Sequence, residues 1–142
     1  MKRFTFKVLG KPVGKQRIKI TTRGKFPHAY TPAKTVDYES RIKQCAIDAG
    51  VEIMERVKVD LMIVIPCGWK TYKLKPNQPL EPLARPDGDN VLKSILDACQ
   101  GVAFVNDKHV MESYVRWGFS RQNNSYVKVT ITEVNWINYL VD

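Results

Sequence analysis

The chain has 142 residues, 44% of them hydrophobic and 26% charged, and its formal net charge is +9. That length and balance predict one globular domain over residues 1–142 and exclude a disordered, collagen-like or coiled-coil protein. The longest apolar stretch, Leu61–Pro66, is far shorter than a membrane span, and the basic start has no secretion signal. Three widely spaced cysteines fit a reducing interior, so we expect a cytoplasmic protein that does not bind membranes.

The first predicted strand covers residues 4–9, where apolar and polar residues alternate. Residues 11–34 are rich in glycine, proline and basic residues, which indicates a long loop or an open hairpin. A helix is then expected from a cap at Thr35 or Asp37 to Ala49. Its buried face is predicted from apolar residues at three- and four-residue spacing: Tyr38, Ile42, Cys45, Ala46 and Ala49.

The middle of the chain predicts a strand, a loop and a second helix. β-branched residues over 57–65 favour a strand, and residues 68–86 with their four prolines favour a long loop. The second helix is expected over 89–100, with Asp89 or Asn90 as its cap. Its buried stripe is predicted to be Val91, Leu92, Ile95, Leu96 and Cys99.

Two further alternating strands are predicted over 110–119 and 125–134, joined as an antiparallel pair by the turn-like residues 121–124. Residues 136–141 are expected to form a short tail packed on a neighbouring element. Strands interleaved with two helices predict an α/β or α+β fold, in which a sheet packs against helices.

The positive charge is concentrated at one end of the chain. Residues 1–36 contain ten basic residues and no acid, whereas residues 37–142 contain 13 basic and 14 acidic residues. Such a block is typical of proteins that bind the phosphate backbone of nucleic acids, although a solvated face without a partner is the alternative. The expected phosphate contacts in this block are Lys11, Lys15, Arg17, Lys19, Arg23 and Lys25.

An acidic cluster within this basic protein is the candidate for catalysis. Asp87 and Asp89 are two residues apart at the mouth of the second predicted helix, and Lys93 and Asp97 follow at four-residue spacing. Two carboxylates this close repel each other unless a cation lies between them. Oxygen donors without histidine or cysteine favour Mg²⁺ or Mn²⁺, which catalyse phosphodiester hydrolysis. Asp107 is the nearest candidate for a third carboxylate.

Simpler explanations remain open for the same residues. Asp89 and Asn90 can act only as a helix cap, and Asp89, Lys93 and Asp97 can form only surface pairs. A calcium-binding EF-hand loop is excluded, because Leu92 occupies its glycine position and Ala98 its bidentate glutamate position.

The full motif is more specific than its parts. Arg-Pro-Asp-Gly-Asp-Asn-x-x-Lys-x-x-x-Asp over residues 85–97, followed by Val-Asn-Asp-x-x-Val over 105–110, resembles the signature of the RusA family of Holliday-junction resolvases. Residues 10–17 and 30–35 also resemble phage and prophage members of that family. The resemblance implies a small α/β subunit that forms a homodimer and nicks the symmetric strands of a four-way DNA junction. It also implies a Mg²⁺ cofactor, which Mn²⁺ can replace, and no small-molecule substrate.

The resemblance assigns roles to individual residues. Asp87, Asp89 and Asp107 match the catalytic, metal-binding aspartates of the family, and Lys93 matches its essential lysine. Residues expected to support the site are Asn90, Asp97 and Asn106. Two positions depart from the family pattern: Gly88 replaces a usually bulky apolar residue and is expected to loosen the loop, and Asn106 replaces one of two paired acids.

The long segment 68–85 resembles an insertion of the longer phage members. Its aromatic and basic residues are expected to stack on the junction and to pair with phosphates. These are Trp69, Tyr72, Lys70, Lys73, Lys75 and Arg85. A disordered linker is the alternative interpretation of this segment.

Three classes of function follow. The leading hypothesis is a Mg²⁺-dependent endonuclease that resolves four-way junctions in recombination and repair, with cleavage of flaps or forks as a variant. The second is a catalytically silent DNA-binding dimer, in which the acids are helix caps. The third is an RNA-binding protein of similar charge, for which the aspartates have no purpose.

Overall fold

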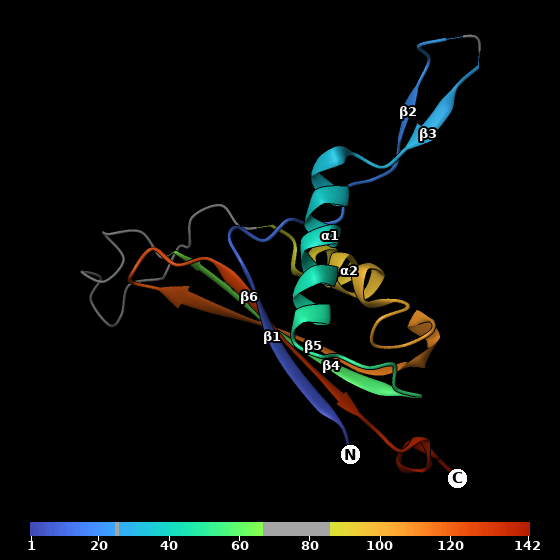
Figure 1. The fold of residues 1–142 in the computed structure, drawn as a ribbon, viewed down its shortest axis with the longest axis vertical. Helices are drawn as coiled ribbons and strands as arrows, with labels where there is room; N and C mark the ends of the chain where they lie inside the picture. The colour runs from blue at the N-terminus through green and yellow to red at the C-terminus, as the bar shows by residue number, and fades with distance from the viewer. Residues whose placement is uncertain (25, 67–85) are drawn as a thin grey trace.

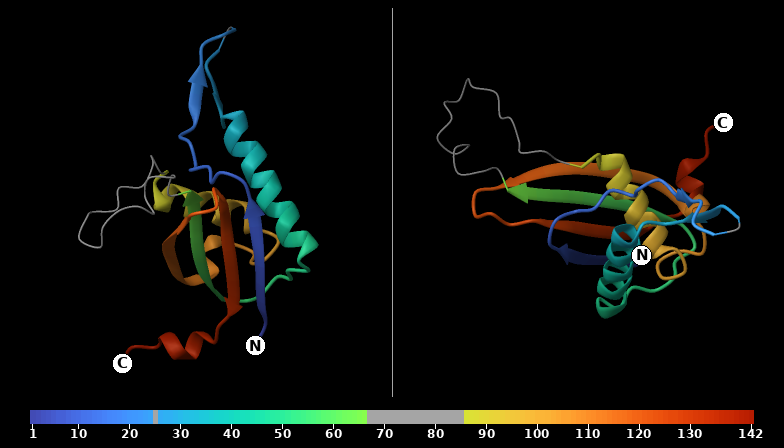
Figure 2. Two further views of the ribbon diagram at one scale, coloured as in Figure 1. Left: turned by 90° about the vertical axis from the view of Figure 1, so that its left-hand side faces the viewer. Right: turned by 90° about the horizontal axis from the view of Figure 1, so that it is seen from above.

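The computed structural model of the chain describes residues 1–24, 26–66 and 86–142. A four-stranded mixed sheet carries two helices, α1 and α2, on one face, and a two-stranded hairpin stands away from this body (Figure 1; Figure 2). The mixed α+β architecture predicted from the sequence is thereby confirmed.

The sheet contains β1 (Arg3–Leu9), β4 (Val57–Pro66), β5 (Val110–Ser120) and β6 (Tyr126–Glu133), in the order β1-β6-β4-β5. β4 is antiparallel to β6 and parallel to β5. The predicted β5–β6 hairpin is therefore wrong, because β4 lies between these two strands. β4 has the most buried residues of the four strands, and a central position gives it a partner on both sides.

Helix α1 spans Ala33–Asp48 and begins before the predicted caps. Its N-cap is Pro32, without a side-chain hydrogen bond, so the predicted cap at Thr35 or Asp37 is wrong. Thr35 is fully buried instead, and its hydroxyl accepts the backbone N–H of Gln16 at 3.3 Å. A contact with a distant segment thus replaces the local cap.

The hairpin consists of β2 (Lys19–Thr21) and β3 (His28–Tyr30), which pair antiparallel. Of the two structures considered for residues 11–34, the hairpin is confirmed over this part. Its side chains are mostly exposed, and Figure 1 shows it as an arm projecting beyond the start of α1.

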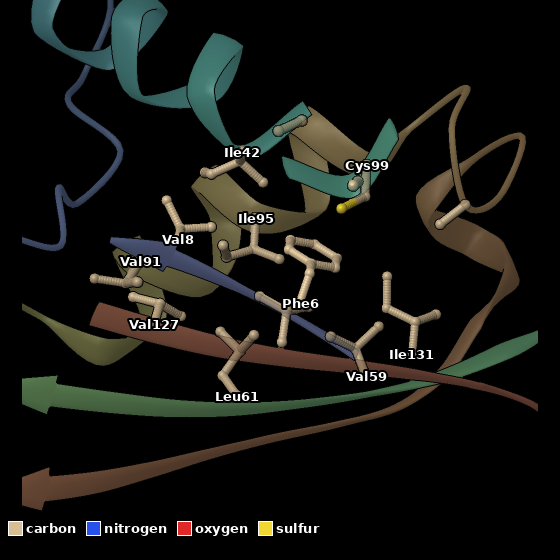
Figure 3. Close-up of a cluster of buried hydrophobic side chains, with 14 of the residues drawn as sticks. Phe6, Val8, Ile42, Val59, Leu61, Val91, Ile95, Cys99, Val127 and Ile131 are labelled. Atoms are coloured by element: carbon tan, nitrogen blue, oxygen red, sulfur yellow. The ribbon is translucent and has the colours of Figure 1, made fainter. Parts of the chain in front are cut away.

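The hydrophobic core lies between the sheet and the two helices (Figure 3). Inward side chains of the strands, such as Phe6 and Leu61, meet Ile42 of α1 and Ile95 of α2. The predicted buried stripes are confirmed in part: Val91, Ile95 and Cys99 are buried, Leu92 and Leu96 are half-buried, and Ala49 is exposed. Ser94 and Ala98 take the remaining buried positions of α2.

The last described helix is a short 3₁₀ turn, η3 (Trp136–Tyr139), beyond β6. The hydroxyl of Tyr139 donates to the carboxylate of Glu112 on β5, which ties the tail to the edge of the sheet. No helix in the described part of the chain is long and apolar enough to cross a membrane.

Candidate active site

Helix α2, which carries most of the predicted acidic cluster, spans Gly88–Cys99. Asp87 is its N-cap: the backbone is extended there, and the carboxylate Oδ1 accepts the backbone N–H of Asp89 at 2.8 Å. The predicted cap at Asp89 or Asn90 is therefore wrong. Asp87 offers the same capping chemistry and is the last extended residue before the helix.

Asp89 and Lys93 lie one turn apart on the exposed side of α2. Asp89 belongs to the first turn, where the backbone dipoles of the helix favour a negative charge. Neither Asp87 nor Asp89 forms an ion pair with a basic residue in the described ranges. The start of α2 thus presents two carboxylates to solvent, and no basic residue of the described ranges pairs with them.

Asp97 has a different environment on the same helix. Its Oδ2 accepts a hydrogen bond from the ammonium of Lys15 at 2.5 Å, and Lys15 also donates to Oε1 of Glu39 on α1 at 2.8 Å. Burial lowers the pKa of Lys15, but the hydrogen bonds to Asp97 and Glu39 raise it more, so the net shift is upward from 10.5. This cation therefore connects the two helices, whereas the sequence predicted it as a DNA contact.

Two further hydrogen bonds hold the segment before the hairpin against α2. The backbone N–H of Lys15 donates to the carbonyl of Asn90 at 2.9 Å, and the hydroxyl of Ser94 donates to the carbonyl of Val13 at 3.2 Å. Asn90, predicted to support the site, thus holds the base of the basic segment beside the two aspartates through its backbone.

Asn106 and Asp107 lie after the C-terminal end of α2. Asp107 begins a 3₁₀ turn, η2 (Asp107–His109), and is exposed. The side chain of Asn106 caps this turn, since its Oδ1 accepts the backbone N–H of Lys108 at 3.0 Å. Asn106 therefore has a local structural role.

The three predicted metal-binding aspartates are not brought together within one chain. Gly88 lies against Val115, whereas η2 directly precedes Val110, and the five residue steps along the strand from Val110 to Val115 span about 17 Å. In residues 1–24, 26–66 and 86–142, no three Asp, Glu, His or Cys side chains form a group that could hold a metal ion. Asp87 and Asp89 are close to each other, and Asp107 is apart from them.

Gly88 allows α2 to approach the sheet closely. A Cβ atom at this position would lie 3.2 Å from Cγ1 of Val115 and 3.5 Å from a ring carbon of Trp117. We expected glycine here to loosen the loop that holds both aspartates. The contact instead indicates that it seats the start of the helix against β5.

The predicted phosphate contacts fall into three groups. Arg17, Lys19 and Arg23 are exposed on or beside the projecting hairpin, and Lys11 is exposed in the loop after β1. Lys15 forms the ion pairs described above. The other predicted contacts lie outside the described residues: Lys25, Trp69, Lys70, Tyr72, Lys73, Lys75 and Arg85.

One residue beside the site was missed by the sequence analysis. Glu39 forms part of the Lys15 pair, but it is 24 residues away in the chain and on another helix. No local spacing could have identified it.

Comparison with known proteins identifies a family that the chain matches. The family model described as endodeoxyribonuclease RusA matches residues 10–132, which include the hairpin, both helices and all three aspartates. A search of the curated proteins finds no match. A match over this share of the chain shows that the protein belongs to the endodeoxyribonuclease RusA family.

Proposed function

We propose that this protein is a Mg²⁺-dependent endonuclease that resolves four-way DNA junctions by paired symmetric nicks during recombination and repair. We expect it to act as a homodimer in the cytoplasm. The observation that carries the proposal is the start of α2 in a chain of this nuclease family, where Asp87 and Asp89 are exposed and adjacent and form no ion pair with a described basic residue.

The donor atoms at the start of α2 fit Mg²⁺. This ion prefers oxygen ligands and is commonly held by one or two carboxylates, with waters and substrate phosphates completing its shell. Asp87 and Asp89 supply such a pair, although Oδ1 of Asp87 already accepts an N–H. When bound there, Mg²⁺ would activate a water and stabilise charge on the phosphoryl oxygens.

The neighbouring side chains have proposed roles in the same reaction. Lys93, one turn after Asp89 and exposed, would pair with the scissile phosphate. The hairpin residues Arg17, Lys19 and Arg23 would hold the DNA backbone without reading bases, which suits an enzyme that recognises shape.

Asp107 requires a separate account, because one chain does not place it beside Asp87. In a homodimer, Asp107 of one subunit would complete the carboxylates of the other. Mixing Asp87→Asn and Asp107→Asn subunits tests this arrangement. Each homodimer should be inactive, whereas the mixed dimer should contain one intact site and recover single-strand nicking. An inactive mixed dimer would place Asp107 in the site of its own chain, and an active Asp107→Asn homodimer would place it outside the site.

The decisive experiment for the function is cleavage of a labelled synthetic four-way junction in Mg²⁺. Linear duplex and flap substrates and an EDTA arm serve as controls. Asp87→Asn is the informative variant, because asparagine is as good a helix cap as aspartate and the fold is preserved. We expect paired symmetric nicks with wild type, which are lost in EDTA and in the variant while junction binding persists.

The alternatives give different results in the same assay. Cleavage of flaps in preference to junctions would indicate the flap or fork variant of the activity. Tight junction binding by folded wild type, without cleavage in Mg²⁺ or Mn²⁺, would favour the silent DNA-binding dimer. Preference for RNA over DNA would favour the RNA-binding alternative.

A further inference from the structure

The four-stranded sheet has a second face that no described helix covers (Figure 2). Odd-numbered residues of β4, such as Leu61, are buried beneath the helices, and even-numbered residues such as Met62 point to the opposite side. We call this opposite side the open sheet face. It is separated from Asp87 and Asp89 by the thickness of the sheet and α2.

A row of long side chains crosses the open sheet face from one edge to the other. Lys7 of β1 is directly opposite Lys128 of β6. Lys128 is also opposite Met62 of β4, whose neighbour on β5 is Arg116. Since adjacent strands are about 4.8 Å apart, the row is about 14 Å long. Three of its four side chains are cationic and exposed.

The row lies in a hollow of about 360 Å³, which Arg3, Asp60, Tyr126 and Thr130 also line. The ammonium of Lys7 lies over the ring of Tyr126, 4.7 Å from its centre, which orients this cation toward the hollow. The lining thus carries four basic residues and one carboxylate.

This arrangement costs stability, and no close ion pair among the described residues offsets the cost. Like charges directly opposite each other on neighbouring strands repel, and Lys7 and Lys128 form such a pair. Among the described residues, none of Arg3, Lys7, Arg116 and Lys128 has a carboxylate oxygen within 4.0 Å. An anionic ligand would relieve this repulsion.

We propose that the open sheet face is a second DNA-binding surface, whose row of Lys7, Lys128 and Arg116 binds backbone phosphates of a duplex arm remote from the cut site. This proposal rests on the proposed function, because it takes DNA as the substrate. A row of cations spread across the sheet fits a line of phosphates on a polyanion better than it fits one small anion.

Charge favours DNA over a second copy of the protein as the occupant. Two copies meeting through this face would bring eight lining cations together against two carboxylates, whereas a duplex supplies a negative charge at every phosphate. The surface reads no bases, so it would hold any arm of suitable shape.

The test compares Lys128→Gln/Arg116→Gln with wild type and with a matched control, Lys43→Gln/Arg121→Gln. Both double variants lose two exposed positive charges, but the control positions lie on α1 and in the turn after β5. Equilibrium binding to a four-way junction is measured by fluorescence anisotropy at several salt concentrations. Junction cleavage is measured with the protein saturating.

We expect the open-face variant to bind about 10- to 30-fold more weakly near physiological salt, with a salt slope smaller by about 1.8, since each phosphate contact contributes about 0.9. The control should change affinity less than about threefold. Cleavage at saturation should persist, because the aspartates are untouched. A Lys128→Gln single variant should also melt about 1–3 °C higher, since it removes the repulsion with Lys7. A higher melting temperature would show that weaker DNA binding comes from a lost phosphate contact and not from a damaged fold.

The other outcomes would each contradict either the second DNA-binding surface or the proposed function. If wild type binds and cuts junctions but the open-face variant matches the control, the second surface is wrong and the proposed function stands. A changed sedimentation coefficient with unchanged DNA affinity would make the face an interface between copies. If wild type binds no DNA, the proposed function fails first.

Discussion

The two faces of α2 show how one helix serves both the fold and the site. Val91, Ile95 and Cys99 are buried on its inner face, where they pack on the sheet and α1. On the outer face, Asp89 is exposed and has no ion pair in the described chain, while Asp97 is neutralised by Lys15. Inner residues determine where the helix lies, and the outer carboxylates without an ion pair in the described chain are the ones that we propose as metal ligands.

The largest expected effect is on junction cleavage, which should distinguish Asp89 from Asp97 on the outer face of α2. Asp89→Asn should reduce junction cleavage about 1000-fold, equivalent to about 4 kcal/mol of lost transition-state stabilisation, because a proposed metal ligand is lost. Asp97→Asn should reduce it less than about tenfold, since its partner is Lys15. Single-turnover cleavage of a labelled junction measures both variants. Equal losses would contradict the distinction drawn between these carboxylates.

Substitutions on the inner face of α2 should lower the free energy of unfolding and leave junction cleavage unchanged. Ile95→Ala should lower the free energy of unfolding by about 3 kcal/mol, because it leaves a cavity at a fully buried position. Urea denaturation followed by circular dichroism measures this loss. Cleavage per folded molecule should stay close to wild type. A variant that keeps its stability and loses activity would place Ile95 in the site.

The inner face also contains a thiol that must remain neutral. Burial raises the pKa of Cys99 from 9.0 to about 12. Its contribution to stability is complete below about pH 9 and is lost as the pH rises toward 12, because only the unfolded chain releases the proton in that window. Wild type should therefore lose about 2 kcal/mol more than Cys99→Ala between about pH 8 and pH 10.5. Parallel urea titrations of both proteins give this difference, and identical losses would refute it.

The smallest effect concerns the ion pair that joins the helices. Lys15→Met should cost no more than about 1 kcal/mol, because the pair is partly exposed. Since hydrogen bonds to Asp97 and Glu39 leave the pKa of Lys15 above 10.5, this contribution is present below pH 10.5 and is lost as the pH rises through the folded-state value. Thermal unfolding of both proteins at neutral pH tests the size. A loss as large as that of Ile95→Ala would mean that the outer face also holds the fold together.

Local patterns predicted the elements well and their partners poorly. The β-branched residues of β4 and the apolar spacing of α1 gave boundaries close to those observed, because both patterns are local features of the sequence. The cap of α1 was missed, since Thr35 interacts with Gln16 from another segment. The predicted β5–β6 pairing was wrong because turn residues do not reveal that a third strand lies between these two strands.

The site shows the same division. The pair Asp87 and Asp89 was predicted from their spacing at the mouth of a helix, and the structure keeps them together there. The separation of Asp107, the Glu39–Lys15–Asp97 contacts and the row on the open sheet face depend on strand order and helix packing. These relations depend on tertiary contacts, so no local pattern in the sequence reveals them.

The pairing of β1 with β6 has a consequence for how the chain folds. The register joins Arg3 to Thr132, so the first strand has no neighbour in the sheet until residues 126–133 have been synthesised. Contacts between such distant parts of a chain close large loops and make folding slow. During translation, β1 therefore remains unpaired until β6 has been synthesised. Over this time the positive charge of the first quarter of the chain is already exposed to any nucleic acid nearby.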